Sequence, residues 1–171
     1  MNKKAILLGC IYGFFVIVYK LFIWKGGYMF SDFGFKYAHI VSVLAIIPFI
    51  IIAIKWVRDG EKGGVIGGKE AMRTAVVVVA ISAIILSFYN YFEFKQNFEA
   101  FTNYYKSDAY MTFLIKDSKA KEIGYDKIIE FQISQLSAFK ATTGKLFPFM
   151  LLGLSASFIT SVFMKRSEAK N

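Results

Sequence analysis

The chain has 171 residues, of which 56% are hydrophobic and only 19% are charged, and its mean hydropathy is +0.48. Soluble domains are usually about 45–50% apolar and about 25% charged, so this composition excludes a disordered chain and indicates a membrane protein. One cysteine excludes an internal disulfide, and one histidine excludes a metal site built from several histidines. The length suits one domain, expected to be a single membrane domain over residues 1–171.

Four apolar runs are each long enough to cross a bilayer, which takes about 20 helical residues. The predicted spans are residues 5–24, 37–57, 71–92 and 146–164. Pro48 lies near the middle of the second run and removes a backbone hydrogen bond, so a kink is expected there. Pro148 lies in the first turn of the fourth run, where proline is tolerated. The expected fold is therefore all-α, an integral membrane bundle of four transmembrane helices.

The first run has an alternative interpretation as a cleaved signal. Leu7 to Cys10 resembles a lipoprotein cleavage site, but only Ala5 to Leu8 would precede it as apolar core. A cleaved signal needs an apolar region of about 7–15 residues before the cut. Because the chain stays apolar well beyond Cys10, a retained helix is the favoured interpretation.

Lys and Arg are concentrated in three segments that four spans place on one side of the membrane. They are Lys3 and Lys4; Lys55, Arg58, Lys62, Lys69 and Arg73; and Lys165, Arg166 and Lys170. The first short loop carries only Lys25 and Lys36, and a segment as long as 93–145 counts little toward orientation. Because basic loops stay in the cytoplasm, we expect a bacterial inner-membrane protein with both termini cytoplasmic and 93–145 extracytoplasmic.

Segment 93–145 is expected to form an extracytoplasmic helical hairpin. One apolar stripe at helical spacing comprises Tyr91, Phe94, Phe98, Phe101 and Tyr105, and a second comprises Ile129, Ile133, Leu136 and Phe139. Ser107 and Asp108 are suited to cap a restart, Asp117 to Gly124 is predicted as a turn, and Gly144 as the stop of the second helix. The outer aromatic surface of Tyr91, Phe94, Phe98 and Phe101 suits packing first and partner binding second.

Small residues recur at helical spacing on three of the spans, and the face on the third span comprises Ala71, Ala75, Ala83 and Ser87. The helix-packing residues of the other two are Gly9 and Gly13 on the first span, and Gly153, Ser157 and Ser161 on the fourth. Such faces let two helix backbones approach closely in lipid. The simplest expectation is that the Gly153 face contacts the Gly9 and Gly13 face within one molecule, with self-association as the alternative.

The glycine-rich loop between the second and third spans contains a partial phosphate-loop motif. Gly63, Gly68 and Lys69 match the motif, but Glu70 stands where Ser or Thr should bind magnesium, and no strand precedes it. The match is therefore interpreted as coincidence. The basic residues of this cytoplasmic loop, Lys55, Arg58, Lys62, Lys69 and Arg73, fit contact with anionic lipid head groups, worth about 1 kcal/mol each.

Catalytic motifs are missing from the sequence. It has no cluster with metal-ligand spacing and no Gly-x-Ser-x-Gly elbow, and its span centres carry no acid or base. Ion-coupled transporters usually place charged groups in span centres, so a pump is disfavoured. We therefore expect no enzyme, no cofactor, no metal and no nucleic-acid partner.

Three stretches together resemble an uncharacterised bacterial family catalogued as domain of unknown function 4199. They are Ile54 to Gly64, the Lys69-Glu70-Ala71 entry to the third span, and Leu146 to Arg166 with its early proline. The resemblance covers most of the chain and implies a four-span inner-membrane protein. It brings no catalytic residues, because none is established for the family.

Taken together, these features favour a non-enzymatic small membrane protein acting as an accessory or scaffold subunit of an envelope complex. The alternative is a protein that binds or transports a lipid or an apolar small molecule, in a pocket between aromatic residues at the outer boundary. The expected partners are membrane lipids, other membrane proteins or a second copy of the chain.

The predicted orientation determines how introduced cysteines react. Lys119→Cys, in segment 93–145, is expected to react with a membrane-impermeant thiol reagent in intact spheroplasts, because that segment faces outward. Lys62→Cys, in the cytoplasmic loop, is expected to stay unlabelled. The opposite pattern would reverse the orientation and move segment 93–145 into the cytoplasm.

Overall fold

The computed structural model describes residues 2–31, 34, 37–116 and 118–165. Lys36, Asp117, Arg166, Lys170 and the side chain of Lys119 lie outside the described residues. The chain forms two compact units, a bundle unit of residues 1–87 and 145–171 and an inserted unit of residues 88–144. Two long helices, α5 and α10, continue from one unit into the other, and each unit is described on its own.

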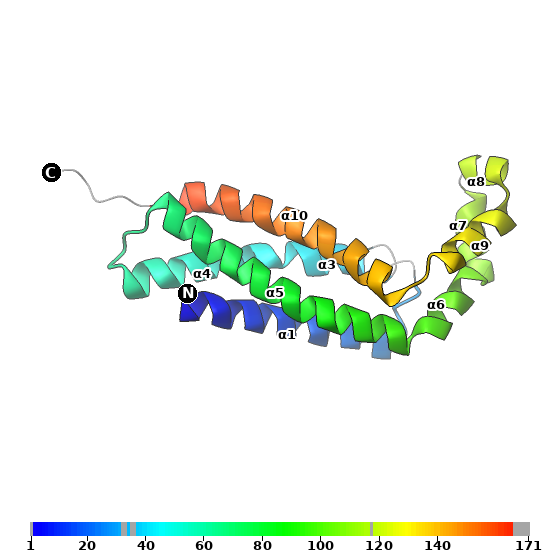
Figure 1. The fold of residues 1–171 in the computed structure, drawn as a ribbon, viewed down its shortest axis with the longest axis horizontal. Coiled ribbons are helices and arrows are strands. Elements are labelled where there is room, and N and C mark those ends of the chain that lie inside the picture. The colour runs from blue at the N-terminus through cyan, green and yellow to red at the C-terminus, as the bar shows by residue number, and fades with distance from the viewer. Residues whose placement is uncertain (1, 32–33, 35–36, 117, 166–171) are drawn as a thin grey trace. The chain divides into compact units, whose positions relative to one another are not determined.

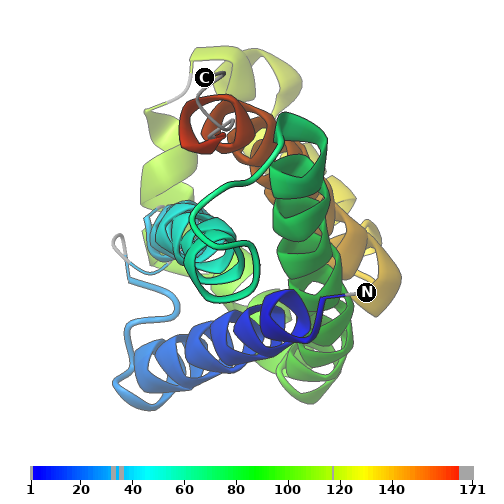
Figure 2. The same ribbon diagram turned by 90° about the vertical axis from the view of Figure 1, so that its left-hand side faces the viewer.

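The bundle unit is built from long apolar helices that lie side by side in both ribbon views (Figures 1 and 2). They are α1 (Lys3–Lys25), α3 (Ala38–Leu44), α4 (Ile46–Glu61), α5 (Gly68–Gln96) and α10 (Ala138–Met164). Four helical segments, with α3 and α4 counted as one, are long and apolar enough to cross a membrane. Their outward faces expose Phe14, Ile84 and Phe163, which suits lipid as the surrounding solvent. The predicted all-α fold with four candidate spans is confirmed.

The second span is interrupted at Ala45, between α3 and α4. Pro48 has no backbone N–H, so it cannot donate the helical hydrogen bond to the carbonyl of Leu44. The interruption falls next to the Leu44 carbonyl, one helical turn before Pro48 and close to the position where a kink is predicted.

Tyr12 occupies the centre of the bundle unit and is fully buried. Its hydroxyl donates a 2.6 Å hydrogen bond to the carbonyl of Ser42 in α3. Its ring stacks on Phe149 of α10, with centroids 5.9 Å apart, and meets Phe49 of α4 edge-on at 5.2 Å. One side chain of α1 therefore contacts the helices on both sides of the Ala45 interruption and also α10.

The inserted unit contains four short helices between α5 and α10. They are α6 (Phe98–Tyr105), α7 (Asp108–Ile115), α8 (Ser118–Ile123) and α9 (Tyr125–Ser134). After α8 the chain turns back, and α9 contacts both α6 and α7, so short helices fold back on each other between the third and fourth candidate spans. The predicted second stripe is divided, because α9 ends at Ser134, Leu136 follows it and Phe139 lies in α10. The core of this unit is Tyr110, Leu114 and Ala120.

Two local features of the inserted unit can be compared with the predicted helix cap and the predicted turn. Ser107 caps α7 as predicted, because its side chain accepts a hydrogen bond from the backbone N–H of Tyr110. The predicted turn from Asp117 to Gly124 is wrong over residues 118–123, which form α8. Burial of Ala120 in the core stabilises this polar segment as a helix.

Gly144 does not end a helix, contrary to the prediction, because α10 begins at Ala138 and runs through it. The backbone N–H of Lys140 donates to the side chain of Ser137, which caps the start of α10. A glycine inside a helix costs about 1 kcal/mol relative to alanine, which a helix of this length can tolerate. The fourth span is thus continuous with a helical turn that the sequence assigns to the hairpin.

Tyr12→Phe tests the role of the central hydroxyl. The variant keeps the ring contacts but loses the hydrogen bond to Ser42, so we expect it to lower the free energy of unfolding by about 0.5–2 kcal/mol. The measurement is unfolding of the purified protein by sodium dodecyl sulfate in mixed micelles. Tyr19→Phe is the matched control, because the Tyr19 hydroxyl has no hydrogen-bond partner among the described residues. Equal stability of Tyr12→Phe and wild type would contradict this role.

Candidate functional site

The glycine face of α1 packs directly against α5. A Cβ added to Gly9 would lie 2.9 Å from the Cβ of Ile81, and one added to Gly13 would lie 3.0 Å from Cγ2 of Ile85. Beside these contacts, the hydroxyl of Ser82 donates to the carbonyl of Val78 at 2.7 Å and shares this hydrogen bond with the carbonyl oxygen of Gly9 at 3.2 Å. The absence of a side chain at these glycines therefore lets α1 and α5 approach closely.

The small-residue face of α10 packs against another side of α5. A Cβ added to Gly153 would lie 2.8 Å from Cγ1 of Val79. Ser157 is fully buried and donates to the carbonyl of Gly153 at 2.7 Å, and Ser161 is buried and donates to that of Phe158. The two glycine faces thus meet α5 and not each other, which differs from the simplest expectation; α1 and α10 touch through the rings of Tyr12 and Phe149.

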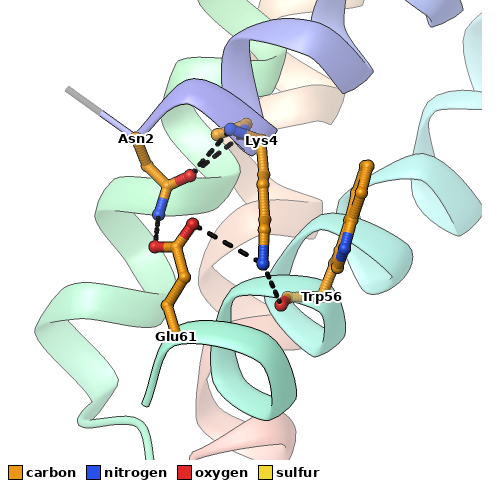
Figure 3. Close-up of polar contacts among 5 residues, drawn as sticks. Asn2, Lys4, Trp56 and Glu61 are labelled. Atoms are coloured by element: carbon orange, nitrogen blue, oxygen red, sulfur yellow. Dashed lines mark hydrogen bonds and ion pairs between the residues drawn. The ribbon is translucent and has the colours of Figure 1, made fainter.

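One end of the bundle unit bears the glycine-rich loop between α4 and α5 and is called the loop-bearing end. It carries a polar cluster that joins α1 to α4 (Figure 3). Asn2 caps α1 and donates from Nδ2 to Glu61 at 2.7 Å. The Nζ atom of Lys4 lies 3.6 Å from the Glu61 carboxylate, 3.4 Å from the carbonyl of Trp56 and 5.5 Å from the centre of the indole ring. In the sequence Lys4 serves only as an orientation signal, and nothing in its spacing identifies Glu61 as its partner.

Two of the five basic loop residues form ion pairs. Arg58 pairs with Asp59 at 2.6 Å, and Lys62 pairs with Glu70 at 2.9 Å. The hydrogen bond from Lys62 to Glu70 raises the pKa of the Lys62 ammonium group, which therefore stays charged at neutral pH. These two residues are therefore occupied by protein carboxylates.

The other three residues, Lys55, Lys69 and Arg73, are exposed, and no ion pair joins them to another described residue. Helix α4 and not a strand precedes the partial phosphate-loop motif. Gly63 has a φ of 58° and Gly64 a φ of 89°, which suit glycine in a tight turn. The context therefore differs from that of a phosphate loop, as the sequence analysis concludes.

The outer aromatic surface is split by a break in the helix at Asn97, between α5 and α6. The side chain of Asn97 donates to the carbonyl of Glu93, which satisfies the end of α5. Phe94 becomes buried and stacks on Phe101, with centroids 4.9 Å apart. Phe98 and Tyr91 stay exposed. The predicted stripe is thus partly a packing contact and partly a free surface.

Three buried polar side chains in the inserted unit were missed by the sequence analysis. Asn90, Glu93 and Thr142 are all less than one-tenth exposed. The hydroxyl of Tyr89 is hydrogen-bonded to Glu93 one helical turn away. Glu93 is the first residue of segment 93–145, and helical periodicity does not reveal that its carboxyl group is buried.

Large apolar side chains are exposed on the short helices of the inserted unit. They are Phe98, Phe113, Ile115, Ile123 and Phe131. Close to them, four tyrosines cluster around the small core: Tyr104, Tyr105, Tyr110 and Tyr125. Burial raises the pKa of Tyr105 and Tyr110, so both stay neutral at physiological pH. These tyrosines thus pack in and against the core of the unit, while the five large apolar side chains are exposed.

A metal site needs several acidic, histidine or cysteine side chains close together. Within the described ranges, no group of three or more His, Cys, Asp or Glu side chains lies close enough to hold a metal ion. The buried hydroxyl groups of Ser82 and Ser157 donate to helix carbonyls. These hydroxyl groups therefore serve helix packing.

Comparison with known proteins identifies the family. The family model described as "Protein of unknown function (DUF4199)" matches residues 3–166, so the chain belongs to this family. This confirms the resemblance seen in the sequence. Neither a curated protein nor a solved structure matches the chain.

Gly9→Ala tests the close approach of α1 to α5. The added methyl group would meet the Cβ of Ile81 and, at 3.0 Å, the backbone oxygen of Val78, neither of which can rotate away. We expect a loss of about 1–3 kcal/mol in unfolding free energy, as for overpacking generally.

Gly144→Ala is the matched control, because nothing lies within 4 Å of a Cβ at that helical position. It should be neutral or stabilising by up to about 1 kcal/mol through helix propensity. Both variants are compared by thermal unfolding in mild detergent. Equal stability of the two would mean that Gly9 is not at a tight contact.

Proposed function

We propose that this member of the family of unknown function 4199 is a non-enzymatic accessory or scaffold subunit of an envelope complex in the bacterial inner membrane. In this proposal both termini lie in the cytoplasm and the inserted unit lies on the extracytoplasmic side of the membrane. The distribution of Lys and Arg supports this orientation. The observation that carries the proposal is the set of apolar side chains exposed on the short helices α6 to α9.

The inserted unit exposes more large apolar side chains than it buries. Its core contains Tyr110, Leu114 and Ala120, whereas five large apolar residues of α6 to α9 are exposed, among them Phe131 at 61%. Contiguous exposed apolar surface on a folded unit marks interaction sites, whereas single exposed residues carry no such meaning. The number of these residues on so small a unit favours a binding surface for another protein.

Aromatic residues are also suited to this role by their energetics. Aromatic side chains dominate the binding energy of protein interfaces, because they bury a large area at a small cost in conformational entropy. Phe113 lies on α7 and Phe131 on α9, which contact each other. The short helices α7 and α9 thus present exposed aromatic rings from one folded unit.

A lipid-binding or lipid-transporting protein is the second candidate. It is supported by aromatic residues exposed on candidate spans of the bundle unit, such as Trp24 and Phe147. Lipid binding predicts that these rings contact acyl chains in a pocket, whereas a scaffold leaves them in the ordinary lipid boundary. The two candidates therefore differ in what lies against the inserted unit.

Site-specific photocrosslinking distinguishes the two candidates. Benzoylphenylalanine replaces Phe131 in the inserted unit or Phe163 in the bundle unit, and cells are irradiated before solubilisation. We expect a discrete protein adduct from position 131 that is identified by mass spectrometry. Position 163, which is 82% exposed on a candidate span, serves as the lipid-facing control and should give mainly lipid adducts.

Asp126 supplies a second control, because it is an exposed charged residue on the same helix as Phe131 but on a different face. Crosslinks from position 126 that match those from position 131 would show general proximity and not docking on the aromatic residues. Phospholipid adducts alone from position 131 would contradict the scaffold proposal and favour the lipid-binding candidate.

A further inference from the structure

We infer that the loop-bearing end of the bundle unit binds the head group of an anionic phospholipid. The inference goes beyond the proposed scaffold function and uses a different part of the molecule. It depends on which charges at this end are already compensated by the protein and which are not.

The described residues at this end include eight cations and three acids. The cations are Lys3, Lys4, Lys55, Arg58, Lys62, Lys69, Arg73 and Lys165, and the acids are Asp59, Glu61 and Glu70. Each acid forms an ion pair, Glu61 with Lys4, Asp59 with Arg58 and Glu70 with Lys62. Five cations are therefore left without a carboxylate among the described residues.

These five uncompensated cations are Lys3, Lys55, Lys69, Arg73 and Lys165, and all five side chains are exposed. They come from the start of α1, the last part of α4, the start of α5 and the residue after α10. A Cβ added to Gly68 would lie 3.9 Å from the Lys165 side chain, so Lys165 lies beside the start of α5. Arg73 follows Lys69 by one helical turn.

Trp56 marks the depth of this surface in a bilayer. Tryptophan concentrates at the level of the lipid head groups, because its ring is apolar and its N–H is polar. Trp56 is exposed, follows Lys55 directly and carries Lys4 over its ring. Lys55 therefore lies at head-group depth and not in bulk water.

Apolar side chains lie one helical turn toward the middle of the bundle from three of these cations. Leu7 lies one turn after Lys3, Ile51 lies one turn before Lys55, and Val162 lies one turn before Lys165. All three apolar side chains are exposed. A phospholipid has the same order of chemistry, with a charged phosphate above an acyl chain. A free phosphate ion would use only the cations, so the apolar neighbours favour a lipid as the occupant.

The test measures binding of dioleoyl phosphatidylglycerol to the purified full-length protein by native mass spectrometry from mild detergent. Dioleoyl phosphatidylcholine, which carries no net charge, is the comparison lipid. We expect wild type to prefer phosphatidylglycerol, and single Lys69→Gln and Arg73→Gln variants to bind it about fivefold more weakly, which corresponds to about 1 kcal/mol per charge. The variant with all five cations changed to Gln should lose the preference.

Two controls separate this surface from general electrostatic attraction. The Lys62→Gln and Glu70→Gln double variant removes an internal pair without changing the net charge and should bind like wild type. A variant with five exposed lysines of the inserted unit changed to Gln has the same loss of charge and should keep the preference; these are Lys95, Lys106, Lys116, Lys121 and Lys127.

Three results would overturn the inference. The first is an unchanged preference for phosphatidylglycerol in the five-cation variant, with circular dichroism showing that it is folded. The second is an equal loss in the inserted-unit control, which would make the preference a property of total charge. The third is full displacement of phosphatidylglycerol by inorganic phosphate at equal concentration, which would make the surface an ion site without a role for the acyl chain.

Discussion

The bundle unit depends on one constraint: α1 and α10 must both lie close to the same helix, α5. Lipid chains are as apolar as the helix surfaces, so burial of apolar area gives little drive for association, and dispersion and hydrogen bonds must supply it. Dispersion and hydrogen bonding between helices both require the two backbones to lie close to each other. Gly9 and Gly153 meet Ile81 and Val79 of α5 at distances that a larger residue would not fit, and the Ser82 hydroxyl reaches the Gly9 carbonyl because of that proximity.

The remaining features of the bundle unit follow from this constraint. With α1 held on α5, Tyr12 extends to the other helices and donates to a carbonyl beside the interruption that Pro48 causes. At the loop-bearing end, the same placement brings Lys4 against Glu61 and Trp56. Pairing of the acids leaves five exposed cations for the lipid head groups. Packing in the bundle thereby determines where the charged surface lies, while the exposed aromatic residues of the inserted unit are set by its own small core.

The sequence predicts features that depend on local chemistry and misses those that depend on long-range contacts. Hydropathy identifies the four spans, Pro48 marks the interruption, and Ser107 marks the start of α7. The spacing of the small residues shows which helix face allows close approach, but it does not identify the helix that packs there. Helix α8 was missed for a related reason, since burial of Ala120 stabilises a polar segment as a helix. The partners of Lys4 and Arg58 depend on side-chain placement that periodicity does not encode.

A double-mutant cycle on Gly153 and Val79 tests the shared contact on α5 most directly. Gly153→Ala adds a methyl group 2.8 Å from Cγ1 of Val79, and Val79→Ala removes that atom and leaves only the Cβ, 3.5 Å away. We expect the double variant to be more stable than the sum of the single effects predicts, by a coupling energy of about 0.5–3 kcal/mol in detergent unfolding. Additive effects of the two substitutions would contradict the close approach of α10 to α5 at Gly153.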